Sequence, residues 1–297
     1  MDRRAKRPKV DSVNHSRPTR ALMAQREDPK GNRLLAALTD ADWERWRPQL
    51  ECIDLARGQV LYEPGRPRGH AYFPTSAVVS LLCPVAGGAS TEIAVVGNEG
   101  VVGISLLLGT GSATNGSAVL IAGRGFRIGA QAIQDEFDRS DAVRRVLLRY
   151  IQALATQVAQ TVICNRHHTI EQQLCGFLLH GLDRLQGSEV VVTQKLVATM
   201  LGVRRESVTQ AASHLHSAGL IHHSRGHISV LDRAGLEKRS CECHAVVKKE
   251  YDRLLPQEPQ EPGARPADPG RRTWPAWAQA APARCTLRRD VAAVGET

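Results

Sequence analysis

The sequence predicts an α+β chain with a β-rich first half, one long helix, and a last third made of short helices and a hairpin. Three observations carry this prediction. Short strand-like runs separated by glycines fill residues 58–129, apolar residues recur every three or four positions from Val143 to Val162, and residues 193–216 form two helical patterns joined at Gly202. Strands alternate and turn at glycine, whereas helices repeat with a period of 3.6, so the patterns mark separate parts of the chain.

The N-terminal segment, residues 1–30, is polar and basic, and we expect a disordered arm that is either solvated or brushes DNA. A short helical pattern follows from Leu34 to Leu50. Its apolar positions are Leu35, Leu38, Trp43 and Trp46.

Four strands are predicted in the glycine-rich region: Val78 to Leu82, Glu92 to Val96, Ala118 to Ile121 and Phe126 to Ile128. Several short strands divided by glycine turns favour an all-β sandwich or roll.

A long amphipathic helix is predicted after Ser140, because no glycine or proline interrupts the apolar repeat there. The repeat consists of Val143, Leu147, Tyr150 or Ile151, Leu154, Val158 and Val162. A near-heptad stripe is typical of a helix that pairs with its twin, and a helix that only packs on the β region is the alternative. A second helix is expected over about residues 169–185, with a hinge near Asn165 to His168.

The two helical patterns in residues 193–216 predict a helix-turn-helix. Thr193 is placed to cap the first helix, whose apolar face contains Leu196, Val197, Met200 and Leu201. Gly202 stands where the turn needs a positive φ. The second helix can pack through Val203, Val208, Ala212 and Leu215, which leaves Arg204, Arg205, Glu206, Thr209 and Gln210 pointing outward.

This outward face has the donors and acceptors that the major groove of DNA requires. Arginine can bond guanine at O6 and N7, glutamate can accept from cytosine N4, and glutamine can bracket adenine. An amphipathic helix pair with a merely solvated charged face is the alternative interpretation.

A hairpin is predicted directly after the helix pair. Gly219 to His223 and His227 to Leu231 alternate as strands, and Ser224-Arg225-Gly226 has turn chemistry. Such a wing would place Arg225 near phosphate. His222, His223 and His227 are interpreted as ordinary surface histidines, because the hairpin contains no carboxylate or cysteine to complete a metal site.

From about Asn32 to Leu255, the chain resembles bacterial transcription regulators of the cyclic-AMP receptor protein/fumarate-nitrate reduction regulator (Crp/Fnr) superfamily. The run Arg205-Glu206-Ser207-Val208 is similar to the family's Arg-Glu-Thr-Val recognition pattern. The resemblance implies a cyclic-nucleotide-binding-like β-roll sensor domain over 31–139, a dimerisation helix over 140–167 and a winged helix-turn-helix DNA-binding domain over 168–255. A Pro/Ala/Arg-rich tail, 256–297, lies beyond the resemblance and is expected to be disordered.

The resemblance also implies how DNA is contacted. Arg205 and Glu206 would read bases, together with Gln210, whose counterpart varies with the target. Phosphate contacts are expected from Gln194, Lys195, Arg204, Ser207, Thr209 and Arg225. The partners would be double-stranded DNA carrying an imperfect inverted repeat, RNA polymerase and a second copy of the chain.

The effector of the β-roll is a separate question. Relatives that bind cyclic nucleotides carry a glutamate for the ribose and an arginine for the phosphate. Here Ile104 stands at the glutamate position, and no Arg or Lys occurs from Gly69 to Gly123. Because burying a phosphate without a cation is costly, we expect no control by cyclic AMP. The candidate pocket residues are Glu99, Gly100, Gly103, Ile104 and Ser117.

No cofactor is predicted. An iron-sulfur cluster is disfavoured because no cysteine precedes Cys52, and haem is disfavoured because His70 is the lone histidine between His15 and His167. Cys241-Glu242-Cys243-His244 could begin a zinc site or a redox pair, but a complete tetrahedral set is not evident. Cys241, Cys243 and His244 therefore remain weak metal candidates.

The composition of the 297 residues indicates which partners, locations and activities to expect. The net charge of +9 fits a polyphosphate partner, although it fits any basic protein equally well. No apolar run could span a bilayer and no signal-peptide core is present, so we expect a cytoplasmic protein without membrane contact. Seven cysteines, an odd number, argue against a disulfide framework.

An enzyme is not expected, because the roll offers only Glu92, Glu99 and scattered serines. The alternative is a β-roll signalling or scaffold module that binds a protein partner or small ligand.

Overall fold

The computed structural model describes residues 27–85, 90–185, 189–190, 192–224 and 227–255. The predicted N-terminal arm, the C-terminal tail and the wing tip at Arg225 lie outside the described residues.

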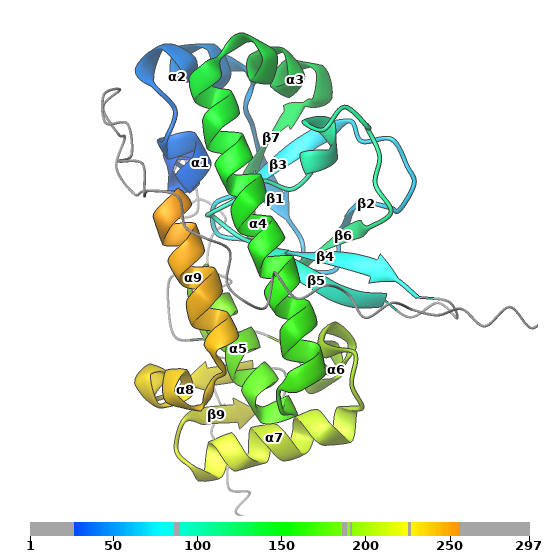
Figure 1. Ribbon diagram of the computed structural model, residues 1–297, viewed down its shortest axis with the longest axis vertical. Coiled ribbons are helices and arrows are strands. Elements are labelled where there is room, and N and C mark those ends of the chain that lie inside the picture. The colour runs from blue at the N-terminus through cyan, green and yellow to red at the C-terminus, as the bar shows by residue number, and fades with distance from the viewer. Residues whose placement is uncertain (1–26, 86–89, 186–188, 191, 225–226, 256–297) are drawn as a thin grey trace, which may run out of the picture. The chain divides into compact units, whose positions relative to one another are not determined.

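Two antiparallel sheets form the predicted β-roll (Figure 1). The first has the order β1-β7-β3, with β1 spanning Glu51–Leu55, β7 Gly123–Gly129 and β3 His70–Pro74. The second has the order β2-β6-β4-β5, with β2 spanning Val60–Tyr62, β6 Gly116–Ile121, β4 Val78–Pro84 and β5 Ser90–Val96. The four predicted strands are confirmed within β4 to β7. The sequence patterns did not reveal β1, β2 and β3, which are only three to five residues long and do not alternate cleanly between apolar and polar side chains.

Short helices flank the roll. Thr39 accepts a hydrogen bond from the Asp42 backbone N–H and so starts a new helix. The predicted Leu34–Leu50 helix is therefore divided into α1 (Arg33–Ala36), α2 (Asp40–Trp46) and a 3₁₀ turn, Arg47–Gln49. Further turns of this type are Pro29–Gly31 and Ile104–Leu106, and α3 (Ala130–Arg139) was not predicted.

The long helix α4 spans Asp141–His167, and the Ser140 hydroxyl accepts from the Val143 N–H at its start. It runs beside α9 (Glu242–Leu254) in Figure 1. The first half of the predicted dimer stripe, Val143, Leu147, Tyr150 and Leu154, is buried in the core of the same chain. Assigning those four positions to a partner helix was wrong, because the roll already covers them. The alternative residue Ile151 and the second half of the predicted stripe, Val158 and Val162, are half-buried or exposed.

The C-terminal part contains the predicted helix-turn-helix and hairpin. Its elements are α5 (Ile170–Leu182), β8 (Glu189–Val190), α6 (Gln194–Leu201), α7 (Arg205–Ser217), β9 (Ile221–Ser224), β10 (His227–Val230) and α8 (Arg233–Arg239). The order β8-β10-β9 adds a third strand to the wing. The segment after the wing forms two helices, because Ser240 is extended and separates α8 from α9.

The two apolar cores meet at the sheet that contains β4, β5 and β6. Val79, Val96 and Val119 belong to the core of the roll, whereas their neighbours, listed by strand as Val78, Val95, Leu120 and Ile121, belong to the core of the helix-turn-helix. Successive side chains on a strand point to opposite faces. This sheet is therefore buried on both faces, which explains why its strands are continuous apolar runs rather than alternating ones.

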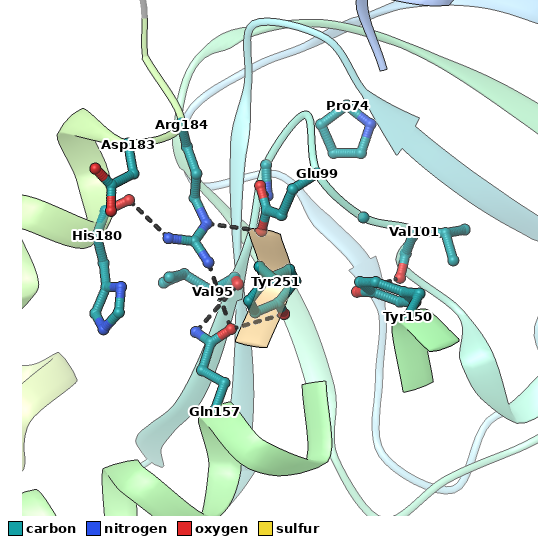
Figure 2. A network of polar contacts seen from close by, with 12 residues as sticks. Pro74, Val95, Glu99, Val101, Tyr150, Gln157, His180, Asp183, Arg184 and Tyr251 are labelled. Carbon is teal, nitrogen blue, oxygen red and sulfur yellow. Dashed lines mark hydrogen bonds and ion pairs between the residues drawn. The ribbon is translucent and has the colours of Figure 1, made fainter. Parts of the chain in front are cut away.

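A buried polar network joins four segments near this sheet (Figure 2). Arg184, just after α5, donates from Nε to Glu99 Oε1 over 2.8 Å and from Nη1 to the His180 carbonyl over 2.8 Å. Gln157 of α4 donates to the Val95 carbonyl over 3.2 Å and accepts from the Tyr251 hydroxyl over 3.0 Å. The network thus links the roll, α4, the segment after α5, and α9.

Removing the guanidinium of this network should be costly. We expect Arg184→Met to lower the free energy of unfolding by about 3–5 kcal/mol, because it leaves the Glu99 carboxylate buried and uncompensated. The double variant Arg184→Met/Glu99→Gln should recover part of that loss. Urea unfolding measures both values.

The matched control is Arg253→Met, because the ion pair of Arg253 with Glu250 lies at the surface. Surface pairs contribute about 0–1 kcal/mol, so this change should be small. A double variant that loses more than Arg184→Met alone would contradict the assignment of a buried charge pair.

Candidate nucleic-acid interface

The turn between α6 and α7 has the geometry that its residues predict. The Thr193 hydroxyl accepts from the Leu196 N–H over 3.1 Å and caps α6. Gly202 ends that helix with φ of 66°, a left-handed conformation in which a side chain is strained. The Val203 N–H then reaches back to the Ala198 carbonyl over 3.0 Å, which fixes the direction in which α7 leaves the turn.

The helix α7 has one buried and one exposed face. Val208, Ala211, Ala212 and Leu215 are buried against the helix-turn-helix core. The opposite face contains the exposed side chains of Arg204, Arg205, Glu206, Thr209 and Gln210. Within the described parts of the chain, neither Arg205 nor Glu206 has an ion-pair partner. Their charged ends therefore face solvent at the first turn of α7.

The other predicted DNA contacts lie around this face. Lys195 is exposed on α6, and Gln194 and Ser207 are half-buried. The Thr209 hydroxyl lies 2.9 Å from Gln194 Oε1 and 3.0 Å from the Arg205 carbonyl oxygen, so it links the two helices.

The wing follows α7 directly. In the hairpin, Ile228 pairs with His223, and Ser229 with His222. The His216 ring of α7 lies 5.6 Å from the ring of His222 and 5.2 Å from that of His223, so these imidazoles pack against the end of the helix.

A cavity of about 490 Å³ lies between the roll and α4. Two of the candidate pocket residues, Gly103 and Ile104, line it, and α4 contributes an apolar wall of Ile151, Leu154, Ala155, Val158 and Ala159. Glu99 instead points to Arg184, and Gly100 packs so closely on the Tyr150 ring that a Cβ there would lie 2.4 Å from it. Ser117 is buried on β6, opposite Leu81.

Arg68 brings a cation into this cavity. Its guanidinium carbon lies 3.6 Å above the centre of the Tyr62 ring, and Nη1 donates to the Ser105 hydroxyl. The side chain is buried, and burial lowers its pKa. The expectation that the pocket lacks a guanidinium was wrong, because Arg68 directly precedes the stretch from Gly69 to Gly123 without Arg or Lys and folds into the cavity.

The three weak metal candidates separate in the structure. His244 Nε2 lies 2.8 Å from an Asp183 carboxylate oxygen, whereas Cys241 and Cys243 face Cys164 and His168. Sequence spacing alone could not show this, because the latter pair lies more than seventy residues earlier in the chain.

Two titratable groups sit between the second sheet and α5. Burial raises the pKa of Glu92 on β5 to about 7, although the Ser80 hydroxyl and Arg184 favour the carboxylate. Burial also lowers the pKa of His180 on α5 well below its usual range, and the nearby Arg184 and His244 add to that effect.

No helix within the described residues is long and apolar enough to cross a membrane.

Comparison with known proteins identifies the C-terminal part of the chain. Residues 172–239 match a family described as a Crp-like helix-turn-helix domain. No curated protein matches the sequence.

Several solved structures have a similar fold. The regulator FixK2 from Bradyrhizobium japonicum superposes with a TM-score of 0.57 at 16% identity, covering 65% of this chain and 98% of its own. A putative Crp/Fnr-family regulator from Eubacterium rectale gives 0.54 at 17% identity, covering 68% of this chain and 94% of its own. The c-di-GMP-responsive global regulator CLP from Xanthomonas campestris gives 0.51 at 17% identity, covering 65% and 99%. The predicted resemblance and the predicted order of β-roll, long helix and winged helix-turn-helix are confirmed.

The pKa shifts of His180 and Glu92 predict opposing effects of pH on stability. Below about pH 6.5, His180 binds a proton in the unfolded chain but stays neutral in the folded protein. This histidine therefore lowers the free energy of unfolding as the pH falls. Folded Glu92 keeps its proton up to about pH 7, so this carboxyl removes stability as the pH rises from 4.5 to 7. His180→Asn should therefore reduce the decrease in the free energy of unfolding that accompanies acidification, and Glu92→Gln should increase that decrease. Each effect should be at most about 1.4 kcal/mol per pH unit.

The measurement is urea unfolding between about pH 5 and pH 7. His167→Asn, at the exposed end of α4, is the matched control. Parallel profiles for His180→Asn and the unsubstituted protein would show that His180 is protonated equally well in the folded and unfolded states.

Proposed function

We propose that this chain, which carries a Crp-like helix-turn-helix domain on the fold of Crp/Fnr transcription regulators, is a sequence-specific DNA-binding transcription regulator. It acts as a homodimer on an imperfect inverted repeat. The observation that carries the proposal is that Arg205 and Glu206 are exposed and have no ion-pair partner among the described residues, at the start of a helix whose other face is buried. Whether the bound protein activates or represses depends on where its site lies relative to RNA polymerase, the remaining partner.

The dimer is supported by an apolar stripe on α4 that the chain itself leaves partly uncovered and that also borders the cavity. Leu148, Ile151, Ala155, Val158 and Val162 repeat at alternating steps of three and four residues, and all are exposed or half-buried. Val162 exposes 64% of its surface, and Leu148 exposes 46%. Apolar a and d positions of this kind bury themselves against a second helix, so a second copy of α4 is the matching partner.

In the bound state each α7 would enter a major groove, with the two half-sites about 34 Å apart. Arg205, Glu206 and Gln210 would read base edges. Gln194, Lys195, Arg204, Ser207, Thr209 and Arg225 would hold phosphates and fix the register.

The chemistry of the cavity supports an effector other than cyclic AMP. Its lining residues include Arg68 but no carboxylate, so a ribose hydroxyl would find no charged acceptor there. Most of the wall is apolar. An apolar molecule with a single anionic group fits this combination better than a nucleotide does, because it can use the guanidinium and leave no polar group unpaired.

A β-roll module that binds a protein partner without reading DNA is the competing function. The same exposed α4 stripe would then contact that partner. Electrophoretic mobility shift with genomic fragments separates the two functions, because only a regulator retains specific fragments against competitor DNA.

Two substitutions should distinguish base reading from phosphate contact. Arg205→Ala should weaken binding to the specific site by about 1–3 kcal/mol and relax the preference at one base pair. Lys195→Ala should weaken specific and scrambled DNA alike and lower the salt slope by about one. Fluorescence anisotropy at several salt concentrations measures both effects.

Lys248→Ala, on the exposed side of α9, is the control for loss of a positive charge far from α7. Equal losses from Arg205→Ala and Lys195→Ala on specific and scrambled DNA would refute the assigned roles.

Calorimetric titration with cyclic AMP tests the effector proposal. We expect no binding in the micromolar range, because the cavity lacks a carboxylate for the ribose. Micromolar binding that disappears in Arg68→Leu would overturn the proposal and show that Arg68 receives the cyclic phosphate.

A further inference from the structure

Four metal-binding side chains converge where α4 ends and α9 begins. Cys164 lies in the last turn of α4, His168 follows that helix, and Cys241 and Cys243 stand at the start of α9. One ligand atom from each of the four residues lies within 4.8 Å of all the others. Cys164 Sγ is 3.6 Å from Cys241 Sγ, and Cys243 Sγ is 3.5 Å from His168 Nδ1.

The 3.6 Å S···S and 3.5 Å S···N separations match two edges of a tetrahedron around a single ion. With Zn–S bonds of about 2.3 Å and Zn–N bonds of about 2.05 Å, tetrahedral geometry sets S···S near ~3.8 Å and S···N near ~3.6 Å. A disulfide would require its sulfurs to lie about 2.05 Å apart, so the observed pair is not bonded. A cluster of several irons would also hold its cysteine sulfurs farther apart than one ion does.

The surroundings of the four residues fit a closed site. Cys241 and Cys243 are buried, and Cys164 and the His168 side chain are mostly covered. His168 Nε2 lies 3.5 Å from a Glu242 carboxylate oxygen, while Nδ1 faces the sulfurs. A carboxylate behind the imidazole keeps the proton on Nε2 and leaves the Nδ1 lone pair for a metal.

The backbone of the site is also fixed. The Gln173 amide of α5 donates to the Cys164 carbonyl over 3.4 Å and to the His168 carbonyl over 3.0 Å. Two of the four ligands are therefore held by one side chain, as expected for positions that must keep a coordination geometry.

We propose that Cys164, His168, Cys241 and Cys243 bind one zinc ion in a closed, structural Cys₃His site. With four protein ligands, no position is open for substrate, so the ion has no catalytic role. Zinc would tie the start of α9 to the break between α4 and α5. It would fix the angle at which the helix-turn-helix leaves the long helix.

A second cluster of candidate ligands, His180, Asp183 and His244, does not compete with this assignment. Asp183 already forms an ion pair with Arg233 and contacts His244, so its carboxylate is engaged by the protein itself. The cysteine cluster has no such cation among the described residues.

The test uses the full chain purified under reducing conditions without added chelator. Metal analysis should find about one zinc per chain, and Co²⁺ replacing it should give the intense visible bands of a tetrahedral site together with thiolate-to-cobalt charge transfer. Competition with a chromophoric chelator should show zinc affinity at least about 100-fold weaker in His168→Ala and in Cys243→Ser. Glu242→Gln should weaken binding about 10–100-fold, because it loosens the imidazole.

Matched controls keep the test independent of folding. His167→Ala removes the neighbouring exposed imidazole, and Cys83→Ser removes a thiol of the roll; both should keep zinc and the Co²⁺ spectrum. Circular dichroism verifies that each variant is folded. The assignment fails if the protein holds no zinc and gives no tetrahedral Co²⁺ spectrum, if mass spectrometry finds a Cys164–Cys241 disulfide instead, or if His167→Ala loses zinc as His168→Ala does. Because no DNA is present, these results do not depend on the regulator proposal.

Discussion

A single buried guanidinium constrains how the parts of this protein meet. Arg184 neutralises Glu99 of the roll, and the same network reaches α4 through Gln157 and α9 through Tyr251. Burying two charges is costly unless they pair in good geometry. An alternative arrangement of these segments would leave at least one charge buried without its partner, at a cost of several kcal/mol. The pair therefore favours one relative placement of the roll and α5 more strongly than apolar contact alone, which tolerates sliding.

The sheet shared by the two cores supplies apolar contact between the roll and the helix-turn-helix, and the Arg184–Glu99 pair fixes how these parts are placed across it. Val78, Val95 and Leu120 face the helix-turn-helix while their neighbours face the roll. One-residue slippage of a strand would exchange the two faces, but both faces are apolar here, so hydrophobicity by itself specifies the register only weakly. The polar network and the bulges at Val78/Val79 and Leu81/Leu82 add the missing specificity.

The sequence allowed prediction of those features that depend on local spacing. The α6 cap at Thr193, the turn at Gly202 and the exposed face of α7 follow from neighbours a few residues apart, and the structure has each of them. Arg68 and the Cys164–His168 pair could not be placed in this way, since long-range folding brings them to their sites. The buried half of the α4 stripe was misassigned because a periodic pattern shows that a face is covered but not what covers it.

The helix α4 takes part in the cavity, the dimer stripe, the polar network and the cysteine cluster. Ile151, Ala155 and Val158 of α4 line the cavity and also belong to the stripe that is open to a second copy. Gln157 and Cys164 connect the same helix to Arg184 after α5 and to Cys241 at the start of α9. A ligand shifts a conformational equilibrium only through differential contact with the two states. An effector that contacts Leu154 and Val158 more closely in one position of α4 than in another would therefore change the dimer stripe and the base of the helix-turn-helix together. Coupling between the proposed effector site and the proposed DNA site would then need no path of successive side-chain shifts within α4, because this one helix of 27 residues runs from the cavity to the segment that precedes α5.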